Sequence, residues 1–293
     1  MVNQFLRYLR YERNRSELTV KSYEDDLRGF QLFFENLDES LSWSTIDSDI
    51  IRLWMEHMMD KGNTARSINR RLSALRSFYR FALAHHLVSK DPVYGLVGPK
   101  NQKTLPQFLR ESEMDNLLDR PVDDPENYIN VRARTIILMF YTTGIRLAEL
   151  IGLDDASVDF LNGQIKVTGK RDKQRVIPFG EELKAELRNY MRLRDKLVPV
   201  NAPALFLTKK GERMNRQQVR REVQKQLATV CTLKKKSPHV LRHTFATAML
   251  NHEAGLESVK KLLGHERIST TEIYTHTTFE QLKRAYMNAH PRA

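Results

Sequence analysis

Apolar residues in the first hundred positions recur every three or four residues, which is the period of an amphipathic helix. Ser16 or Thr19 could cap the first clear helix, whose apolar positions are Tyr23, Leu27, Phe30 and Phe34. A second helix is expected from about Ile46 to Met59, where the pair Gly62-Asn63 follows and ends it. The pattern therefore predicts a helical N-terminal region.

The segment from Thr64 to Ala84 is expected to form a helix with one apolar and one basic side. The apolar side holds Ile68, Leu72, Leu75, Tyr79 and Ala82, and the opposite side holds Arg66, Arg70, Arg76 and Arg80. Residues 64–83 contain five arginines and no acidic residue. Because a merely solvated face usually mixes both signs of charge, we expect these arginines to face an anionic partner. A solvated basic face is the alternative.

A polar, basic stretch with Gly98, Pro99 and Pro106 separates this region from the rest of the chain. Such a composition is typical of a linker between domains. The sequence therefore predicts a helical domain at residues 1–97, a linker at 98–106 and a second domain at 107–293.

The second domain combines helices with a small sheet. Alternating patterns predict strands at Val158–Leu161 and Gln164–Thr168, joined by a two-residue turn at Asn162-Gly163, and a third strand at Arg175–Phe179. The fold class expected for the whole chain is thus mainly α, in two domains, with a β-hairpin sheet in the second.

The helices of the second domain surround these strands in sequence. They are expected at Glu111–Asp119, at the strongly apolar Val131–Tyr141, and from Glu181 to the end. Pro238, with Ser237 before it, is well placed to start one of them. The last helix carries an apolar row of Phe279, Leu282 and Tyr286.

Charge and cysteine content narrow the class of protein. Residues 1–100 hold 15 Lys and Arg against 13 Asp and Glu, whereas residues 101–293 hold 33 against 23. A basic surplus on a folded domain favours a nucleic-acid partner. Cys231 is the single cysteine, which excludes an internal disulfide and a cysteine zinc site. The charged N-terminus lacks the apolar region of a signal peptide. We therefore expect a cytoplasmic protein that is not bound to a membrane.

Six residues of the second domain together could break a phosphodiester without a metal or another cofactor: Arg146, Lys170, His239, Arg242, His265 and Tyr274. A tyrosine can attack phosphorus if a base or a positive site favours its phenolate, because its ordinary pKa is near 10. Arginine forks match phosphate oxygens, and histidine or lysine can move the protons. Each residue alone has an ordinary structural explanation, so the interpretation depends on their combination and order.

The segments TGIRLAEL, LRHTFAT and LLGHERISTTEIYTH, with this order of residues, closely resemble the tyrosine site-specific recombinase family. The resemblance covers nearly the whole chain. It implies a SAM-like core-binding domain at the N-terminus, whose anionic partner is DNA, and a catalytic domain after it. The length and the ending His290-Pro-Arg-Ala293 are similar to Xer-type members, which resolve chromosome dimers.

The resemblance also implies roles for the six residues. Tyr274 would form a 3′-phosphotyrosyl link, Arg146 and Arg242 would hold the phosphate, and His239 and His265 would assist proton movement. Lys170 would be the general acid. Because Arg171 stands where the family commonly has glycine, Lys173 is its rival for this role. Four protomers, alike or paired with a paralogue, would act on two double-stranded DNA sites through a Holliday junction, with a DNA translocase as a further possible partner.

Three other functions compete with this interpretation. An integrase of a mobile element would use the same chemistry. A type IB-like topoisomerase would nick and reseal one duplex without a tetramer. A DNA-bending accessory protein would keep the fold without catalysis. The intact set of six residues argues against this alternative, because a protein that only binds DNA needs no nucleophile. The resemblance further implies that the last helix packs into a neighbouring protomer through its apolar row.

Overall fold

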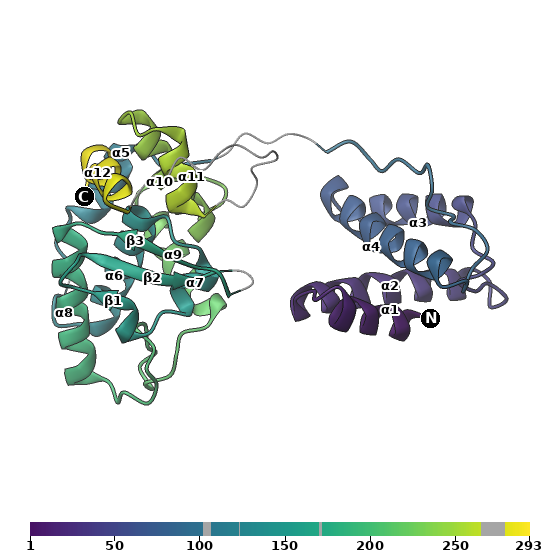
Figure 1. Ribbon diagram of the computed structural model, residues 1–293, viewed down its shortest axis with the longest axis horizontal. Coiled ribbons are helices and arrows are strands. Elements are labelled where there is room, and N and C mark those ends of the chain that lie inside the picture. The colour runs from purple at the N-terminus through teal and green to yellow at the C-terminus, as the bar shows by residue number, and fades with distance from the viewer. Residues whose placement is uncertain (102–106, 123, 170–171, 265–278) are drawn as a thin grey trace. The chain divides into compact units, whose positions relative to one another are not determined.

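The computed structural model describes residues 1–101, 107–122, 124–169, 172–264 and 279–293. The chain forms two compact units, Met1–Thr104 and Leu105–Ala293. Helices dominate both units, and the second unit also holds a three-stranded sheet (Figure 1). The predicted fold class is therefore confirmed. No helix within these described ranges has both the length and the apolar content needed to cross a membrane.

The described residues of the first unit form four α-helices. Ser16 caps the second of them, as its Oγ accepts a hydrogen bond from the Thr19 amide at 3.4 Å, and Thr64 caps the fourth through the Ser67 amide at 3.3 Å. A π-helical segment, Tyr8–Glu12, continues the first helix. The helices are α1 (Val2–Arg7), α2 (Glu17–Leu37), α3 (Ser48–Asp60) and α4 (Ala65–Ala84).

Aromatic side chains fill the core of the first unit. The ring centroids of Phe30 and Trp54 are 4.7 Å apart, and those of Trp43 and Phe78 are 4.5 Å apart. The Tyr79 hydroxyl donates to the Trp43 carbonyl at 3.1 Å, so its burial leaves no unpaired polar group. The predicted apolar side of α4 is fully buried, which confirms the amphipathic assignment of that helix: Ile68, Leu72, Leu75, Tyr79 and Ala82.

In the second unit, the helix α6 (Tyr128–Thr143) is buried around most of its circumference, and its apolar run Ile136–Tyr141 is fully buried. It packs against α8, α9 and α10. Gly144 ends α6 in the left-handed conformation, with φ of +58°, and a Cβ there would come within 2.4 Å of the Phe245 ring. The other helices of this unit are α5 (Glu111–Leu118), α7 (Leu147–Ile151), α8 (Glu181–Leu197), α9 (Arg216–Ala228), α10 (Pro238–Asn251), α11 (Leu256–Leu263) and α12 (Phe279–Ala289).

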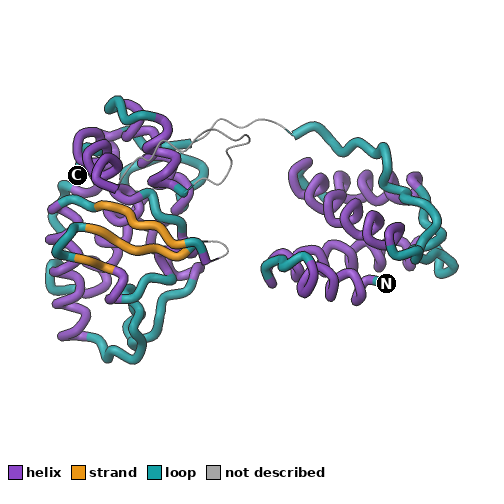
Figure 2. Tube along the Cα trace, in the orientation of Figure 1, coloured by secondary structure: helices purple, strands orange, loops and turns teal. Residues whose placement is uncertain are grey.

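The sheet is antiparallel with strand order β1-β2-β3 (Figure 2). Its strands are β1 (Val158–Asp159), β2 (Gln164–Thr168) and β3 (Gln174–Pro178). The predicted two-residue turn is wrong, because Asp159 already pairs with Gln164 and four residues lie between them. The Asp159 carboxylate accepts hydrogen bonds from the amides of Leu161 and Asn162, which closes this longer loop.

The C-terminal helix α12 packs on its own chain. Tyr286 is fully buried with Phe245 and Leu262 in a separate apolar cluster. His290, which is also buried, lies with Nε2 3.0 Å from the Tyr141 carbonyl oxygen, and this distance requires the proton on Nε2. Phe279 and Leu282 remain half-buried, so one member of the predicted row serves the chain's own core. Packing of this helix into a neighbouring protomer stays a prediction.

Arg292 binds the C-terminal end of the chain to other parts of the second unit. Its guanidinium donates to Glu182 at 2.7 Å, to Asp115 at 3.0 Å and to Asp119 at 2.5 Å. These carboxylates come from α8, from α5 and from the residue that follows α5. The C-terminus is therefore held between two helices.

Candidate active site

Arg146 stands at the N-terminal cap of α7, where its side chain is 39% exposed. The Arg146 amide donates to Glu149 Oε2 at 2.9 Å, and Nη1 donates to Glu149 Oε1 at 2.8 Å. Nη2 donates to the Gly264 carbonyl at 2.7 Å. One edge of this guanidinium is thus held by the protein while the side chain stays open to solvent.

Arg242 lies on α10 and is almost fully buried. Its Nη1 donates to the Gly144 carbonyl at 2.5 Å, and its Nη2 donates to the Leu263 carbonyl at 2.6 Å. Burial, together with the positive charges of Arg146 and Arg175, lowers the pKa of Arg242 to about 10. The guanidinium still carries its charge at neutral pH, and it carries it in a largely desolvated site.

Glu149 is the buried counter-ion between two of the arginines. Arg175, on β3, donates to its two oxygens at 2.7 Å and 2.9 Å, beside the bonds from Arg146. Burial alone would raise the pKa of Glu149, but the bonds from Arg175 and Arg146 outweigh it and hold the pKa below its ordinary value. The carboxylate is therefore ionised. Glu149 stands three residues after Arg146, which is the spacing of a capping box, and this spacing is the signal by which the sequence could have indicated it.

Three guanidiniums bind to the C-terminal end of α11. The consecutive carbonyls of Leu262, Leu263 and Gly264 accept hydrogen bonds from Arg175, Arg242 and Arg146 respectively. The final carbonyls of a helix have no partner within it and carry its negative dipole end, so cations stabilise them. Two predicted site residues, Arg146 and Arg242, are therefore brought to one place. Glu149 and Arg175 were not predicted.

His239 lies one helical turn before Arg242 on α10 and is exposed. Partial desolvation of the ring, with the positive charges of His243, Arg220 and Arg242, lowers its pKa below the ordinary value. The ring is thus neutral at pH 7 and able to accept a proton. His239 and Arg242 both lie on α10, but Arg242 is buried whereas His239 is exposed.

The remaining three predicted residues, Lys170, His265 and Tyr274, lie outside the described residues. Lys170 follows Gly169, whose amide donates to the Lys173 carbonyl at 2.8 Å. This bond continues the pairing of β2 and β3 by one step beyond the ends of the two strands. No group of three His, Cys, Asp or Glu side chains that could hold a metal occurs in the part of the chain that the structure describes.

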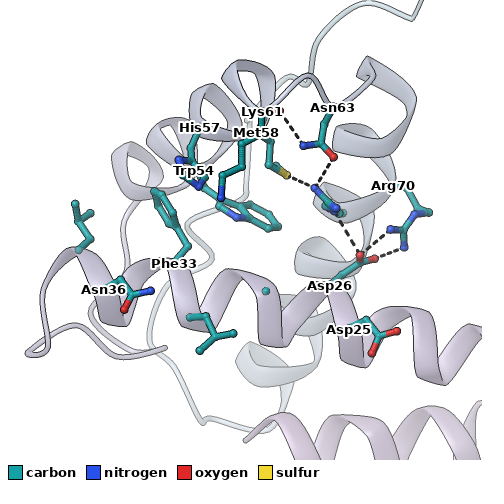
Figure 3. A pocket seen from close by; sticks show the side chains of 14 residues that line it. Asp25, Asp26, Phe33, Asn36, Trp54, His57, Met58, Lys61, Asn63 and Arg70 are labelled. Atoms are coloured by element: carbon teal, nitrogen blue, oxygen red, sulfur yellow. Dashed lines mark hydrogen bonds and ion pairs between the residues drawn. The ribbon is translucent and has the colours of Figure 1, made fainter.

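The four arginines of α4 that were predicted to bind DNA differ in their surroundings. Arg70 donates to both carboxylate oxygens of the buried Asp26, and Arg76 donates to the Leu96 carbonyl at 2.7 Å. Arg66 and Arg80 are exposed. Figure 3 shows Arg70 turned toward Asp26 at one end of a groove of about 660 Å³ between α2, α3 and α4.

The ion pair with Asp26 gives Arg70 a structural role. Burial raises the pKa of Asp26 despite the opposing effect of Arg70 and Arg71, so this carboxylate depends on its partners to stay charged. Periodicity placed Arg70 on the basic side of α4, but it could not reveal an acid on α2. Arg66 and Arg80 are the better candidates for contacts with phosphate.

Changing Arg66 and Arg80 together to glutamine should weaken DNA binding and reduce the slope of log K against log salt by about 2, without lowering thermal stability. Arg70→Gln is the matched control, because it should lower the free energy of unfolding by about 1–2 kcal/mol as it removes a partner of the buried Asp26. Binding titrations across salt and thermal melts separate the two effects. An unchanged salt slope in the double variant would show that Arg66 and Arg80 form a solvated basic face and do not contact phosphate.

Comparison with known proteins identifies the family. Residues 107–281 match the phage integrase family, and residues 2–86 match the SAM-like domain found at the N-terminus of phage integrases. The chain belongs to the phage integrase family. Its curated relatives are tyrosine recombinases, so this family member is a site-specific DNA recombinase.

Two relatives illustrate the match. The tyrosine recombinase XerC of Pelotomaculum thermopropionicum is 38% identical, over 100% of this chain and 98% of the relative. XerC of Staphylococcus aureus is also 38% identical, over 99% and 96% respectively. Among solved structures, the XerH site-specific recombinase bound to a palindromic difH substrate aligns with a TM-score of 0.71 and 22% identity, over 97% of this chain and 84% of that one. This last likeness establishes the shared fold.

Proposed function

We propose that this recombinase cleaves DNA with Tyr274 as the nucleophile. The phenol oxygen attacks the scissile phosphorus and displaces the 5′-oxygen, which leaves a 3′-phosphotyrosyl bond and a free 5′-hydroxyl. The observation that carries the proposal is the meeting of Arg146 and Arg242 at the last turn of α11. The chain leads directly from this turn into the segment with His265 and Tyr274.

The two arginines would hold the non-bridging oxygens as charge builds up on them during the attack. Arg242 supplies a desolvated positive charge, which interacts with an anion more strongly than an exposed one would. Arg146 offers a half-exposed fork fixed by Glu149. His239, neutral at pH 7, and His265 would assist proton movement, and Lys170 would protonate the departing 5′-oxygen.

Rejoining would reverse this chemistry on a partner strand. A 5′-hydroxyl from the second duplex attacks the phosphotyrosine and releases the tyrosine. One phosphodiester replaces another of similar energy, so the cycle needs neither ATP nor a metal ion. Two such exchanges, with two of four protomers active at a time, pass through a Holliday junction.

The biological role proposed is the resolution of chromosome dimers in the cytoplasm before cell division. The full-length match to XerC proteins supports this role over that of a mobile-element integrase. Residues 1–97 would clamp DNA from one side, with Arg66 and Arg80 facing phosphates, and residues 107–293 would hold the active site. A paralogous recombinase and a DNA translocase are the further partners proposed.

Trapping on nicked suicide substrates that carry candidate resolution sites tests the proposal. Such a substrate loses a short fragment after cleavage, so the covalent intermediate accumulates. The wild-type protein should form a denaturation-resistant complex in EDTA without ATP, and the released fragment should carry a 5′-hydroxyl. A released 5′-phosphate, or cleavage without protein attachment, would contradict the proposed chemistry.

A further inference from the structure

Arg175 is held by three hydrogen bonds within the candidate site. Its two Nη atoms donate to the two oxygens of Glu149 at 2.7 Å and 2.9 Å, and its Nε donates to the Leu262 carbonyl at 3.0 Å. Only 16% of the side chain is exposed. This arrangement joins β3 to both α7 and α11, the elements that hold Arg146 and accept its bonds.

The backbone around Arg175 is shaped to receive it. Gly264 adopts φ of +64°, and a Cβ at this position would lie 3.2 Å from Cδ and Nη1 of Arg175. Glycine thus serves two purposes here, since it permits the left-handed end of α11 and leaves space for the guanidinium. The three carbonyls of this turn each bind a different arginine, so loss of one arginine changes the environment of the other two.

The charge balance gives Arg175 a second effect on the site. Glu149 is shared between Arg146 and Arg175, and its Oε1 accepts from both guanidiniums. Without Arg175, the carboxylate would have Arg146 as its sole guanidinium partner among the described residues. Arg146 would then be drawn toward Glu149 and less available to an incoming phosphate.

We propose that Arg175 is a positioning residue for DNA cleavage: it fixes Glu149 and the last turn of α11 so that Arg146 and Arg242 remain directed at the scissile phosphate. This assignment rests on the proposed function of those two arginines. Arg175 itself has three of its N–H donors engaged by protein atoms, and it acts through its neighbours.

Arg175→Gln is the direct test, and Arg132→Gln is its matched control. Arg132 is likewise buried, binds one carboxylate, Glu222, through two nitrogens, and donates to one carbonyl, Leu207, at 2.6 Å. Both variants should lose thermal stability. Single-turnover formation of the covalent DNA complex should slow on the order of 10- to 100-fold in Arg175→Gln alone, with DNA affinity unchanged. Arg175→Lys, which keeps the charge without the fork, should be intermediate.

A substrate with a methylphosphonate at the scissile position separates positioning from folding. This linkage lacks the charged non-bridging oxygen, so it depends less on the arginines. The rate ratio between wild type and Arg175→Gln should therefore shrink to within about threefold on it. An equal ratio on both substrates, or a wild-type rate in Arg175→Gln, would overturn the assignment. A wild-type protein that forms no covalent complex would instead overturn the proposed function, and this assignment with it.

Discussion

Tyr274→Phe should abolish covalent attachment to DNA while noncovalent binding stays within about threefold of wild type, since the change removes one oxygen and leaves every positive charge in place. Denaturing gels of suicide-substrate reactions measure the covalent complex, and gel-shift titrations measure binding. No other group in the proposed mechanism can replace the phenol oxygen as nucleophile, so the loss should be complete.

Tyr286→Phe is the matched control for this experiment. Tyr286 is fully buried in the core beside α10 and α11, where its hydroxyl lies near Thr142 and the Gly180 backbone. Removal of that hydroxyl should leave cleavage intact. A covalent complex that persists in Tyr274→Phe, or that disappears equally in Tyr286→Phe, would contradict the assignment of the nucleophile.

Arg242→Ala should slow cleavage by about 10²- to 10³-fold, because it removes a charge that acts in a desolvated site. The carbonyls of Gly144 and Leu263 would also lose their donors, so stability should fall as well. Single-turnover rates at saturating DNA report the loss of catalysis, and thermal melts report the loss of stability. A wild-type cleavage rate would exclude Arg242 from the phosphate clamp.

Arg242→Lys distinguishes the charge from the shape of the side chain. Burial lowers the pKa of the arginine to about 10, well below its ordinary value. A lysine has a lower ordinary pKa than an arginine, so the same burial should make it lose its proton at a lower pH. Cleavage by the lysine variant should therefore decline with rising pH before cleavage by the wild type does. Parallel pH–rate profiles would contradict this expectation.

Periodic patterns predicted the elements well where one side of a helix or strand is buried. The apolar side of α4 followed from spacing alone, and the start of α10 at Pro238 followed from its fixed φ and missing amide. The short strand β1 was predicted two residues too long. There, the Asp159 carboxylate binds nearby amides and ends the pairing early, which a pattern of apolar residues does not record.

The site was predictable to the extent that its chemistry is local. Arg146 and Arg242 stood out through their motifs, but the ion pair between Glu149 and Arg175 joins segments far apart in the sequence. The same limit explains Arg70, whose partner Asp26 lies on another helix. The periodic pattern predicts on which side of a helix a charged residue lies. Only the packed structure shows which residue of opposite charge pairs with it.

Mass spectrometry of the trapped covalent complex tests the central claim most directly. After nuclease and protease digestion, one peptide should carry a nucleotide through a phosphate on the Tyr274 oxygen, with the link at the 3′ end of the DNA. An adduct on any other residue, or a link to the 5′ end, would contradict the account.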